Sequence, residues 1–162
     1  MDKNVQIKIK KINADAITPQ KQTKHSSGYD LYSNENTTIG INQTKLIHTG
    51  ISVEIPEGFE LQIRPRSGLA LKKNITVLNT PGTIDSDFRG EIGVILHNFG
   101  NKVFGIAKGD RVAQMVLNEV FGIYFIVVDS LEETDRGTGG FGSTDKKEIK
   151  EKLNIDLTNI KK

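Results

Sequence analysis

Short segments in which apolar and polar residues alternate constrain the fold of this chain more than any other feature of its sequence. Apolar side chains recur at every second position in residues 5–9, 51–55, 59–63 and 92–96. Successive side chains of a β-strand point to opposite faces, so a period of two predicts strands with one buried face. Turn-forming residues separate these segments, as in the Pro-Glu-Gly sequence at 56–58. We therefore expect an all-β sandwich or barrel, formed by one domain of a 162-residue chain.

Three other segments lack this alternation. Residues 123–128 are all apolar, which predicts a strand that is buried on both faces and is too short to cross a membrane. Residues 69–73 predict a short helical turn. Near the end of the chain, Asp145 is placed to cap a helix over residues 146–153. For this last segment we favour a solvated terminus over a helix that docks on a partner.

Composition excludes several kinds of site. The chain has no cysteine, which excludes disulfides, thiolate nucleophiles and cysteine-ligated zinc. Its three histidines, His25, His48 and His97, lie far apart, so a transition-metal site held by side chains is not expected. Six of the 22 basic and four of the 20 acidic residues lie in residues 145–162, so charge balances over the rest of the chain and no nucleic-acid partner is expected. The N-terminus shows no apolar leader segment, and we expect a cytoplasmic protein without membrane contact.

Arginine is scarce, and its positions are informative. The chain has 17 lysines and five arginines, and each arginine lies beside a segment punctuated by Gly or Pro. The arginines are Arg64, Arg66, Arg89, Arg111 and Arg136. The planar guanidinium group binds phosphate through two parallel hydrogen bonds, which lysine cannot do. The set indicates an anionic ligand, with a structural ion pair as the alternative for any single arginine.

Two polar segments carry residues suited to phosphate and water chemistry. In residues 64–70, the hydroxyl of Ser67 and nearby N–H groups can face an anion, although an ordinary exit from a strand fits equally well. In residues 82–92, Asp85 and Asp87 share one face of a strand-like segment. A carboxylate in a cleft there could deprotonate a water molecule, whereas a polar hairpin tip is the simpler interpretation.

A glycine-rich segment near the end of the chain adds a further candidate. Residues 136–144 contain four glycines, one arginine and a single aromatic residue, Phe141. Such a segment suits a flexible lid that becomes ordered on a polyphosphate, with the aromatic ring stacked on a base; a flexible linker is the alternative. Residues 26–31 and 109–116 each indicate a turn that enters a strand, and Gln114 is either a phosphate ligand or a surface amide.

In this order the five segments resemble the five motifs of the homotrimeric dUTP pyrophosphatase (dUTPase) family, and the resemblance extends from Ser26 to Thr144. It implies a jelly-roll-like β-barrel over residues 1–135 and a flexible Gly-rich arm over residues 136–144. A tail over residues 145–162, helical or disordered, lies beyond the resemblance. The family assignment also implies a closed homotrimer in which several subunits contribute to each active site.

The implied reaction is the hydrolysis of dUTP to dUMP and pyrophosphate, which limits uracil incorporation into DNA and supplies dUMP for thymidylate synthesis. Mg²⁺ is expected on the triphosphate, without direct protein ligands. Matched by motif position, Asp85 would be the general base that activates water. Asp30 would act indirectly, through magnesium-bound waters or by supporting the site. The implied substrate-binding residues are Arg66, Ser67, Gly68, Asn79, Gly82, Thr83, Ile84, Phe88, Gln114, Arg136, Phe141, Gly142, Ser143 and Thr144.

The resemblance assigns these residues to different parts of the substrate. Asn79 and residues 82–84 would form hydrogen bonds with the edge of the uracil ring. Phe88 would pack on the deoxyribose and leave no room for a 2′-hydroxyl. Residues 66–68 and Gln114 would hold phosphates. The arm would arrive from a neighbouring subunit, cap the uracil with its aromatic ring and bind the γ-phosphate.

The sequence departs from the family pattern at three places. Ser26 and Ser27 precede Gly28 where Ala or Pro is common, and we expect little effect from this difference. Phe88 stands where Tyr is usual, which keeps the ring and removes a hydroxyl, and we expect sugar discrimination to survive. Asp145 replaces the usual Gly after the last motif, where an acid beside the γ-phosphate is unfavourable unless it points away.

Two other functions compete with this assignment. A non-catalytic dUTPase-like regulator that binds nucleotide or protein would account for the tail, but the presence of Asp85, Asn79 and Gln114 argues against lost catalysis. A dCTP deaminase-like enzyme shares the fold family. Its chemistry needs a Glu base on the strand that follows the Asp85 segment, where Ile95 stands, and an aliphatic side chain cannot transfer protons.

Overall fold

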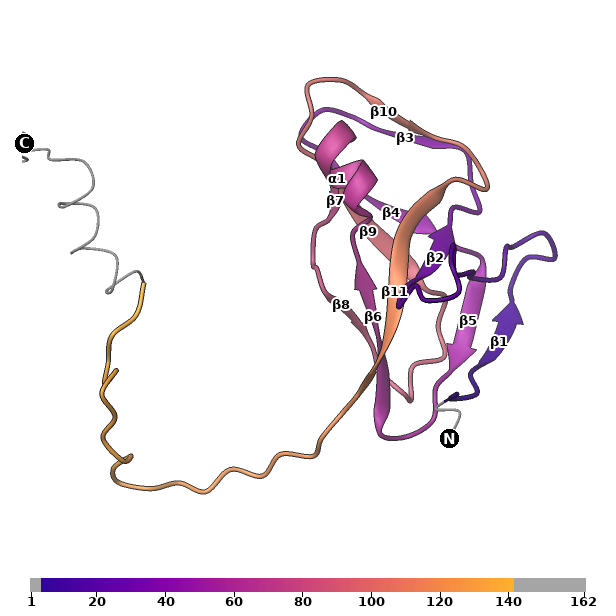
Figure 1. Cartoon of the computed structure of the whole chain (residues 1–162). Coiled ribbons are helices and arrows are strands. Elements are labelled where there is room, and N and C mark those ends of the chain that lie inside the picture. The colour runs from indigo at the N-terminus through magenta and orange to yellow at the C-terminus, as the bar shows by residue number, and fades with distance from the viewer. Residues whose placement is uncertain (1–3, 142–162) are drawn as a thin grey trace, which may run out of the picture. The chain divides into compact units, whose positions relative to one another are not determined.

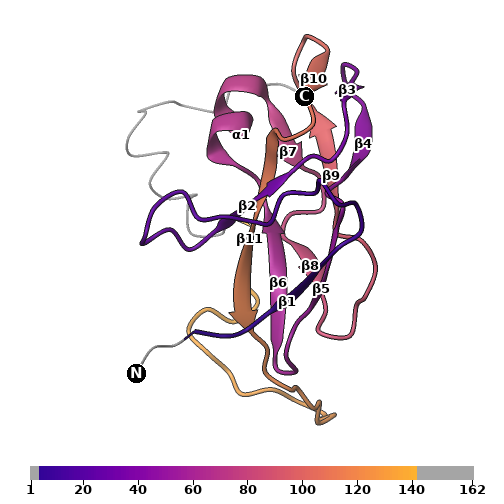
Figure 2. The same cartoon turned by 90° about the vertical axis from the view of Figure 1, so that its right-hand side faces the viewer.

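The computed structural model describes residues 4–141 and divides into two compact units, residues 1–122 and residues 123–162. Among the described residues, the first unit contains eleven β-strands and one helix, α1 (Ser67–Lys73) (Figure 1, Figure 2). The strands are β1 (Lys8–Lys11), β2 (Tyr29–Tyr32), β3 (Thr37–Ile39), β4 (Thr44–His48), β5 (Ile51–Glu54), β6 (Phe59–Arg64), β7 (Ile75–Val77), β8 (Gly82–Ile84), β9 (Gly93–Asn98), β10 (Phe104–Ile106) and β11 (Arg111–Glu119).

Strands that pair in this unit are mostly distant in the sequence. One sheet has the order β2-β11-β6-β8, a second has the order β4-β9-β7, and β1–β5 and β10–β3 form two further pairs. Every strand pairing among the described residues is antiparallel. Such crossed connections between antiparallel strands are typical of a jelly-roll-like fold. The predicted all-β class is confirmed. The alternating segments 51–55, 59–63 and 92–96 coincide closely with β5, β6 and β9, whereas the segment 5–9 overlaps only the first two residues of β1.

The hydrophobic core follows the alternation that the sequence shows. In β9, Val94 and Leu96 are at most 1% exposed, while their neighbour Ile95 is only half-buried. Val94 pairs with Ile47 of β4, and Leu96 pairs with Val77 of β7, so all four buried side chains share one face of the sheet. Burial of each such side chain stabilises the fold by roughly 1.5–3 kcal/mol, which fixes the register of the strands.

The helix α1 follows β6 closely and confirms the helical turn expected over residues 69–73. It begins after Arg66, whose backbone is extended, and ends at Asn74, whose left-handed φ of 55° leads the chain into β7. Lys72 and Lys73 lie in the last turn, where the helix dipole favours positive charge. The helix therefore holds the residues after Arg66 at one end of β6.

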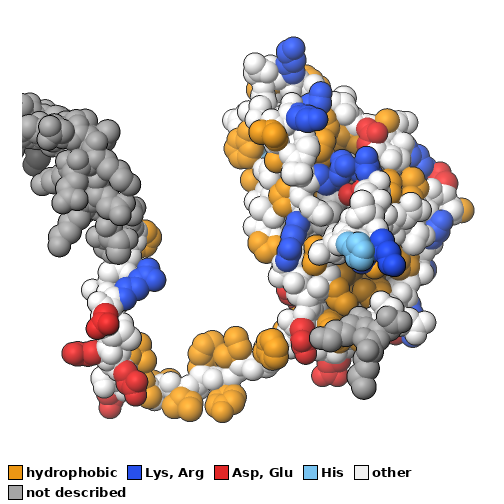
Figure 3. Space-filling model, in the orientation of Figure 1, with side chains coloured by type: hydrophobic (Ala, Val, Ile, Leu, Met, Phe, Trp, Pro, Cys, Tyr) orange, Lys and Arg blue, Asp and Glu red, His pale blue; other side chains and the backbone are white. Residues whose placement is uncertain are grey.

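The described part of the second unit, residues 123–141, contains neither strand nor helix. Its apolar side chains project from the chain (Figure 3), and Phe125 and Val127 are 89% and 96% exposed. The strand predicted over residues 123–128, buried on both faces, is therefore wrong for the single chain. An apolar run indicates burial, but it does not specify which chain provides the covering surface.

The ends of the chain leave several expectations open. The first compact unit ends at Gly122, and the domain, arm and tail limits at residues 135 and 144 stay predictions. The helix expected over residues 146–153 lies outside the described residues. No helix of the described part is both long enough and apolar enough to span a bilayer.

Candidate functional site

The sheet of order β2-β11-β6-β8 places four of the five sequence segments side by side. Its register pairs Gln114 of β11 with Asp30 of β2 on one side and with Arg64 of β6 on the other. One step along β6, Ile63 pairs with Gly82 of β8. Antiparallel pairing therefore places these segments side by side in a single sheet, although Asp30 and Gln114 are 84 positions apart in the sequence.

Asp30 holds two of the scarce arginines together. The Nε atom of Arg66 lies 3.2 Å from Oδ1 of Asp30, and the Nη1 atom of Arg111 lies 3.1 Å from Oδ2 of Asp30. Arg66 also donates through Nη1 to the carbonyl oxygen of Arg111 at 3.0 Å. The Asp30 side chain is only 10% exposed, so its charge is balanced by the guanidinium groups more than by water. These contacts fix the orientation of both arginines.

Gln114 is anchored beside this cluster. Its Nε2 atom donates to the carbonyl oxygen of Pro65 at 2.9 Å, in the segment that leads into α1. A Cβ atom added at Gly28 would lie 2.2 Å from Oε1 of Gln114. A side chain at position 28 would therefore displace the Gln114 amide from the place that it occupies beside Gly28.

Ser67 and Gly68 form the first turn of α1, directly after Arg66, and both residues are exposed. Apart from its two chain neighbours and the backbone of α1 itself, no described residue lies within 4 Å of a Cβ atom built at Gly68, so there is space beside this turn. Arg66, Ser67, Gly68 and Gln114 thus form a polar surface with fixed positive charge near the end of β6. This surface is suited to an anion.

Asp85 and Phe88 bound a tight turn that follows β8. The N–H group of Phe88 donates to the carbonyl oxygen of Asp85 at 3.2 Å. Asp85 and Asp87 are both exposed, and the Phe88 ring is 40% exposed. A carboxylate with open access to solvent at position 85 suits the uptake of a proton from water.

The residues of β8 lie between Asn79 and this turn. Gly82 is buried, Ile84 is half-buried, and Thr83 and Asn79 are exposed. The amide nitrogen of Asn79 lies 3.2 Å from the position that a Cβ atom on Gly82 would occupy, so the amide lies close over the strand. Among the described residues β8 is the last strand of its sheet, so one of its backbone edges pairs with no other strand and is suited to hydrogen bonds with a planar ligand.

Within one chain, these two groups of residues lie at opposite ends of the sheet. The β6 strand runs toward Arg66, whereas the antiparallel β8 strand runs away from it, toward Asp85. Leu61 lies opposite Ile84, so Asp85 falls near the level of residue 60, six positions from Arg66. At the usual rise per residue, this places Arg66 and Asp85 roughly 20 Å apart along the strands. Figure 1 shows α1 at the upper end of β6 and the chain after β8 at the lower end.

Arg136 and Phe141 lie in the second unit and are exposed. Arg136 donates through Nε to the carbonyl oxygen of Gly139 at 2.9 Å, and the Gly139 N–H donates back to the carbonyl oxygen of Arg136 at 3.0 Å. Gly137 and Phe141 both have a left-handed φ, 49° and 51°. The described part of the Gly-rich segment therefore forms short turns on its own. Three predicted site residues lie outside the described residues: Gly142, Ser143 and Thr144.

Two contacts of this site have no signal in the sequence. No specific role is predicted for Arg111, because its partner Asp30 lies 81 residues away. The sequence indicates Arg111 only through the scarcity of arginine and through its place in the segment that contains Gln114. The close approach of Gly28 to Gln114 is likewise invisible in the sequence beyond the glycine itself.

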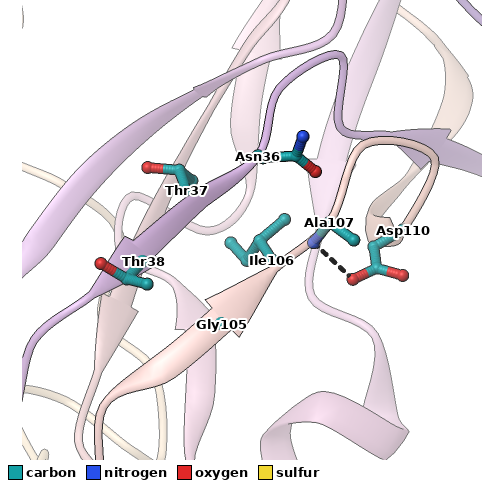
Figure 4. A pocket seen from close by; sticks show the side chains of 7 residues that line it. All are labelled: Asn36, Thr37, Thr38, Gly105, Ile106, Ala107 and Asp110. Atoms are coloured by element: carbon teal, nitrogen blue, oxygen red, sulfur yellow. Dashed lines mark hydrogen bonds between the residues drawn. The ribbon is translucent and has the colours of Figure 1, made fainter.

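A shallow depression between β3 and β10 contains none of the predicted site residues (Figure 4). It is lined by residues 36–38, residues 105–107 and Asp110. The Asp110 carboxylate accepts the N–H of Ala107 at 2.8 Å and so closes a turn. Among residues 4–141, no group of three or more His, Cys, Asp or Glu side chains is placed to hold a metal ion. We assign no function to this depression.

Known proteins resemble this chain along most of its length. The dUTPase family model matches residues 14–145. A deoxyuridine 5′-triphosphate nucleotidohydrolase of Nautilia profundicola is 54% identical over 142 residues, which cover 88% of this chain and 100% of the relative. The solved structure of a Staphylococcus bacteriophage 80alpha dUTPase with dUpNHpp has a TM-score of 0.79 and 25% identity, covering 85% of this chain and 97% of that chain.

A second solved structure is similar in fold. A mutant dUTPase from phage phi11 of S. aureus, in which a structural Mg(II) ion is coordinated, has a TM-score of 0.73 and 22% identity. The alignment covers 79% of this chain and 99% of that chain. By the extent of the family match and the identity to the curated relative, the chain belongs to the dUTPase family.

Proposed function

We propose that this chain hydrolyses dUTP to dUMP and pyrophosphate. The proposal rests on one observation: Asp30, Gln114 and Arg64 lie next to one another on three paired strands. This pairing brings segments that are distant in the sequence close to guanidinium groups, which are suited to a triphosphate. Membership in the dUTPase family supports the same reaction.

The triphosphate binds near the end of β6. The planar guanidinium group of Arg66 donates hydrogen bonds to the phosphate oxygens. Beside it, the hydroxyl of Ser67 and the backbone N–H groups of Ser67 and Gly68 are further donors, and Gln114 lies close by. Both oxygens of Asp30 already face guanidinium groups, so the donors here suit an anion better than a bare cation. Mg²⁺ is therefore part of the substrate, carried by the triphosphate oxygens, and Asp30 acts by positioning the arginines.

The uracil and the deoxyribose bind along β8. The Asn79 amide and the backbone of residues 82–84 supply the donors and acceptors that read the uracil edge. A pocket shaped to this edge has no space for the 5-methyl group of thymine. Phe88 packs on the deoxyribose, where a 2′-hydroxyl would collide with the ring.

Asp85 is the general base of the reaction. Its carboxylate takes a proton from a water molecule as the water oxygen forms a bond to the α-phosphorus. The bond from the α-phosphorus to the oxygen that bridges to the β-phosphorus breaks, and pyrophosphate leaves. Positive charge from the arginines stabilises the negative charge that develops on the phosphate oxygens.

Each active site is shared between copies of the chain in a homotrimer. The attacked phosphorus and its neighbouring phosphates are only a few bonds apart, whereas Arg66 and Asp85 of one chain lie about 20 Å apart along the strands. One substrate therefore meets Arg66 of one copy and Asp85 of another. A closed ring of three copies satisfies this requirement at all of its sites.

Residues 123–128 link the copies. Their exposed apolar side chains need a covering surface. Among the described residues, β1 pairs only with β5, and the groove beside it is lined in part by Val5, Ile7 and Ile9. The segment of one copy adds to β1 of its neighbour as an extra strand. The arm that follows, residues 136–144, then caps the uracil and binds the γ-phosphate of a neighbouring site.

The proposed reaction limits uracil incorporation into DNA and supplies dUMP for thymidylate synthesis. We place the enzyme in the cytoplasm, where its nucleotide substrate is found. Neither nucleic acid nor a membrane takes part in the proposed function.

A chromatographic product assay with Mg²⁺ tests the proposal, with dUTP, dCTP, dTTP and UTP offered in separate reactions. We expect selective conversion of dUTP to dUMP and pyrophosphate. Deamination of dCTP would instead indicate a deaminase, although Ile95, which is half-buried in β9, offers no base for that reaction. The absence of any turnover by the folded protein would favour a nucleotide-binding regulator.

A further inference from the structure

The backbone on both sides of Phe88 is held by hydrogen bonds. The Phe88 N–H closes the turn by donating to the carbonyl oxygen of Asp85. Arg89 donates through Nη1 to the carbonyl oxygens of Ser86, at 2.7 Å, and Phe88, at 3.0 Å. The Phe88 backbone is therefore braced, and the freedom that remains is rotation of the side chain.

The Phe88 ring lies directly over Gly90. A Cβ atom added at Gly90 would lie 2.5 Å from Cζ, 2.9 Å from Cε2 and 3.3 Å from Cε1 of the ring. Gly90 is not among the described glycines with a left-handed φ, so its backbone also accommodates alanine. Glycine at position 90 therefore makes room for the Phe88 ring, and the conformation of the backbone does not require it.

The space above Gly90 allows the ring to lie where it does. Phenylalanine has no hydroxyl group, so no hydrogen bond can fix its orientation. The ring is 40% exposed and can rotate away from a new methyl group at little cost to the fold. Carbon atoms pack at about 3.5–4.0 Å, so a methyl group at position 90 displaces the tip of the ring by roughly 1 Å.

We propose that Gly90 is a specificity-determining positioning residue, which seats the Phe88 ring so that it fits a deoxyribose and excludes a ribose. The inference rests on the proposed function, in which Phe88 packs on the sugar. A displaced ring loses its contact with dUTP, while UTP has no comparable contact to lose. The ratio of kcat/KM for dUTP to kcat/KM for UTP therefore falls when Gly90 gains a side chain.

The first experiment compares Gly90→Ala and Gly90→Ser with the unchanged enzyme. We expect the dUTP-to-UTP ratio of kcat/KM to fall about tenfold, the effect of a small misfit in a packed pocket, while the thermal unfolding midpoint stays close to that of the parent. Gly105→Ala is the matched control, because a Cβ atom there would meet no atom within 4 Å. An unchanged ratio in both Gly90 variants would overturn the inference.

A double-mutant cycle separates this inference from the proposed role of Phe88. If Gly90 acts through the ring, adding Gly90→Ala to a Phe88→Ala enzyme leaves the substrate ratio where Phe88→Ala alone puts it. An equal further fall in that background would show that Gly90 acts independently of Phe88 and would reject the inference. If Phe88→Ala alone leaves the ratio unchanged, the proposed contact between Phe88 and the sugar is wrong, and the inference fails with it.

Discussion

At the scale of single residues, the carboxylate of Asp30 is the contact that holds the arginines beside the proposed phosphate-binding residues. Its two oxygens face Arg66 and Arg111, which belong to segments on opposite sides of the helix α1 in the sequence. The sequence singles out Arg66 as a candidate phosphate ligand, because guanidinium chemistry is a property of one side chain. It cannot identify the Asp30 partnership, because that contact exists only after three strands have paired.

Replacement of Asp30 by asparagine tests this arrangement. Asp30→Asn leaves two guanidinium groups without their counter-charge, and we expect the free energy of unfolding to fall by about 2 kcal/mol. Urea unfolding at a fixed protein concentration measures the change. Asp15→Asn is the control, because it removes an exposed ion pair with Lys108 and should leave the unfolding midpoint nearly unchanged. Equal midpoints for the two variants would contradict the positioning role.

The general base is tested at Asp85. Asp85→Asn keeps the size of the side chain and removes its basicity, so we expect kcat for dUTP to fall by roughly 10²-fold to 10⁴-fold. Steady-state kinetics with pyrophosphate detection provides the measurement. Asp87→Asn, two positions away and also exposed, should retain most of the activity. A loss of less than tenfold in the Asp85 variant would remove Asp85 from the role of base.

At the scale of elements, local pattern predicts strands well and predicts their partners poorly. The alternation in residues 59–63 and 92–96 correctly indicates β6 and β9, because one face of each strand is covered by the same chain. Residues 123–128 carry an equally strong apolar signal, yet they form no strand in the single chain. Hydrophobicity reports that a segment becomes buried, and it holds no information about whether the covering surface belongs to the same molecule.

The approach of Gly28 to β11 gives a prediction at this scale. Gly28→Ala introduces a methyl group that collides with the Gln114 amide and displaces it from Pro65. Under the proposed role of Gln114 as a phosphate ligand, loss of its hydrogen bond should raise KM for dUTP roughly tenfold. Initial-rate kinetics measures KM, and the change should disappear in a Gln114→Ala background, where no amide remains to be displaced. An unchanged KM in Gly28→Ala would show that the amide does not contact substrate.

At the scale of the whole molecule, the exposed apolar residues 123–128 predict that the chain assembles with other copies of itself, which cover this segment. Phe125→Asp places a charge in the segment that we expect to add to β1 of a neighbour. The dissociation constant of the trimer should rise by about 100-fold or more, and light scattering coupled to size-exclusion chromatography should detect monomers at micromolar concentration. Ser130→Asp, outside the apolar run, and deletion of residues 136–162 should both leave the trimer intact. A trimer that persists in Phe125→Asp would exclude this segment as the link.

The separation of Arg66 from Asp85 along one sheet has a genetic consequence. Chains with Arg66→Ala and chains with Asp85→Asn should each be inactive when they assemble alone. When the two kinds are produced together in equal amounts and assemble at random, about one site in four takes its arginine and its aspartate from intact donors. Two defective alleles would then complement each other and restore about a quarter of the normal turnover. If a single chain supplied both residues, the same mixture would stay inactive, and the two alleles would fail to complement each other.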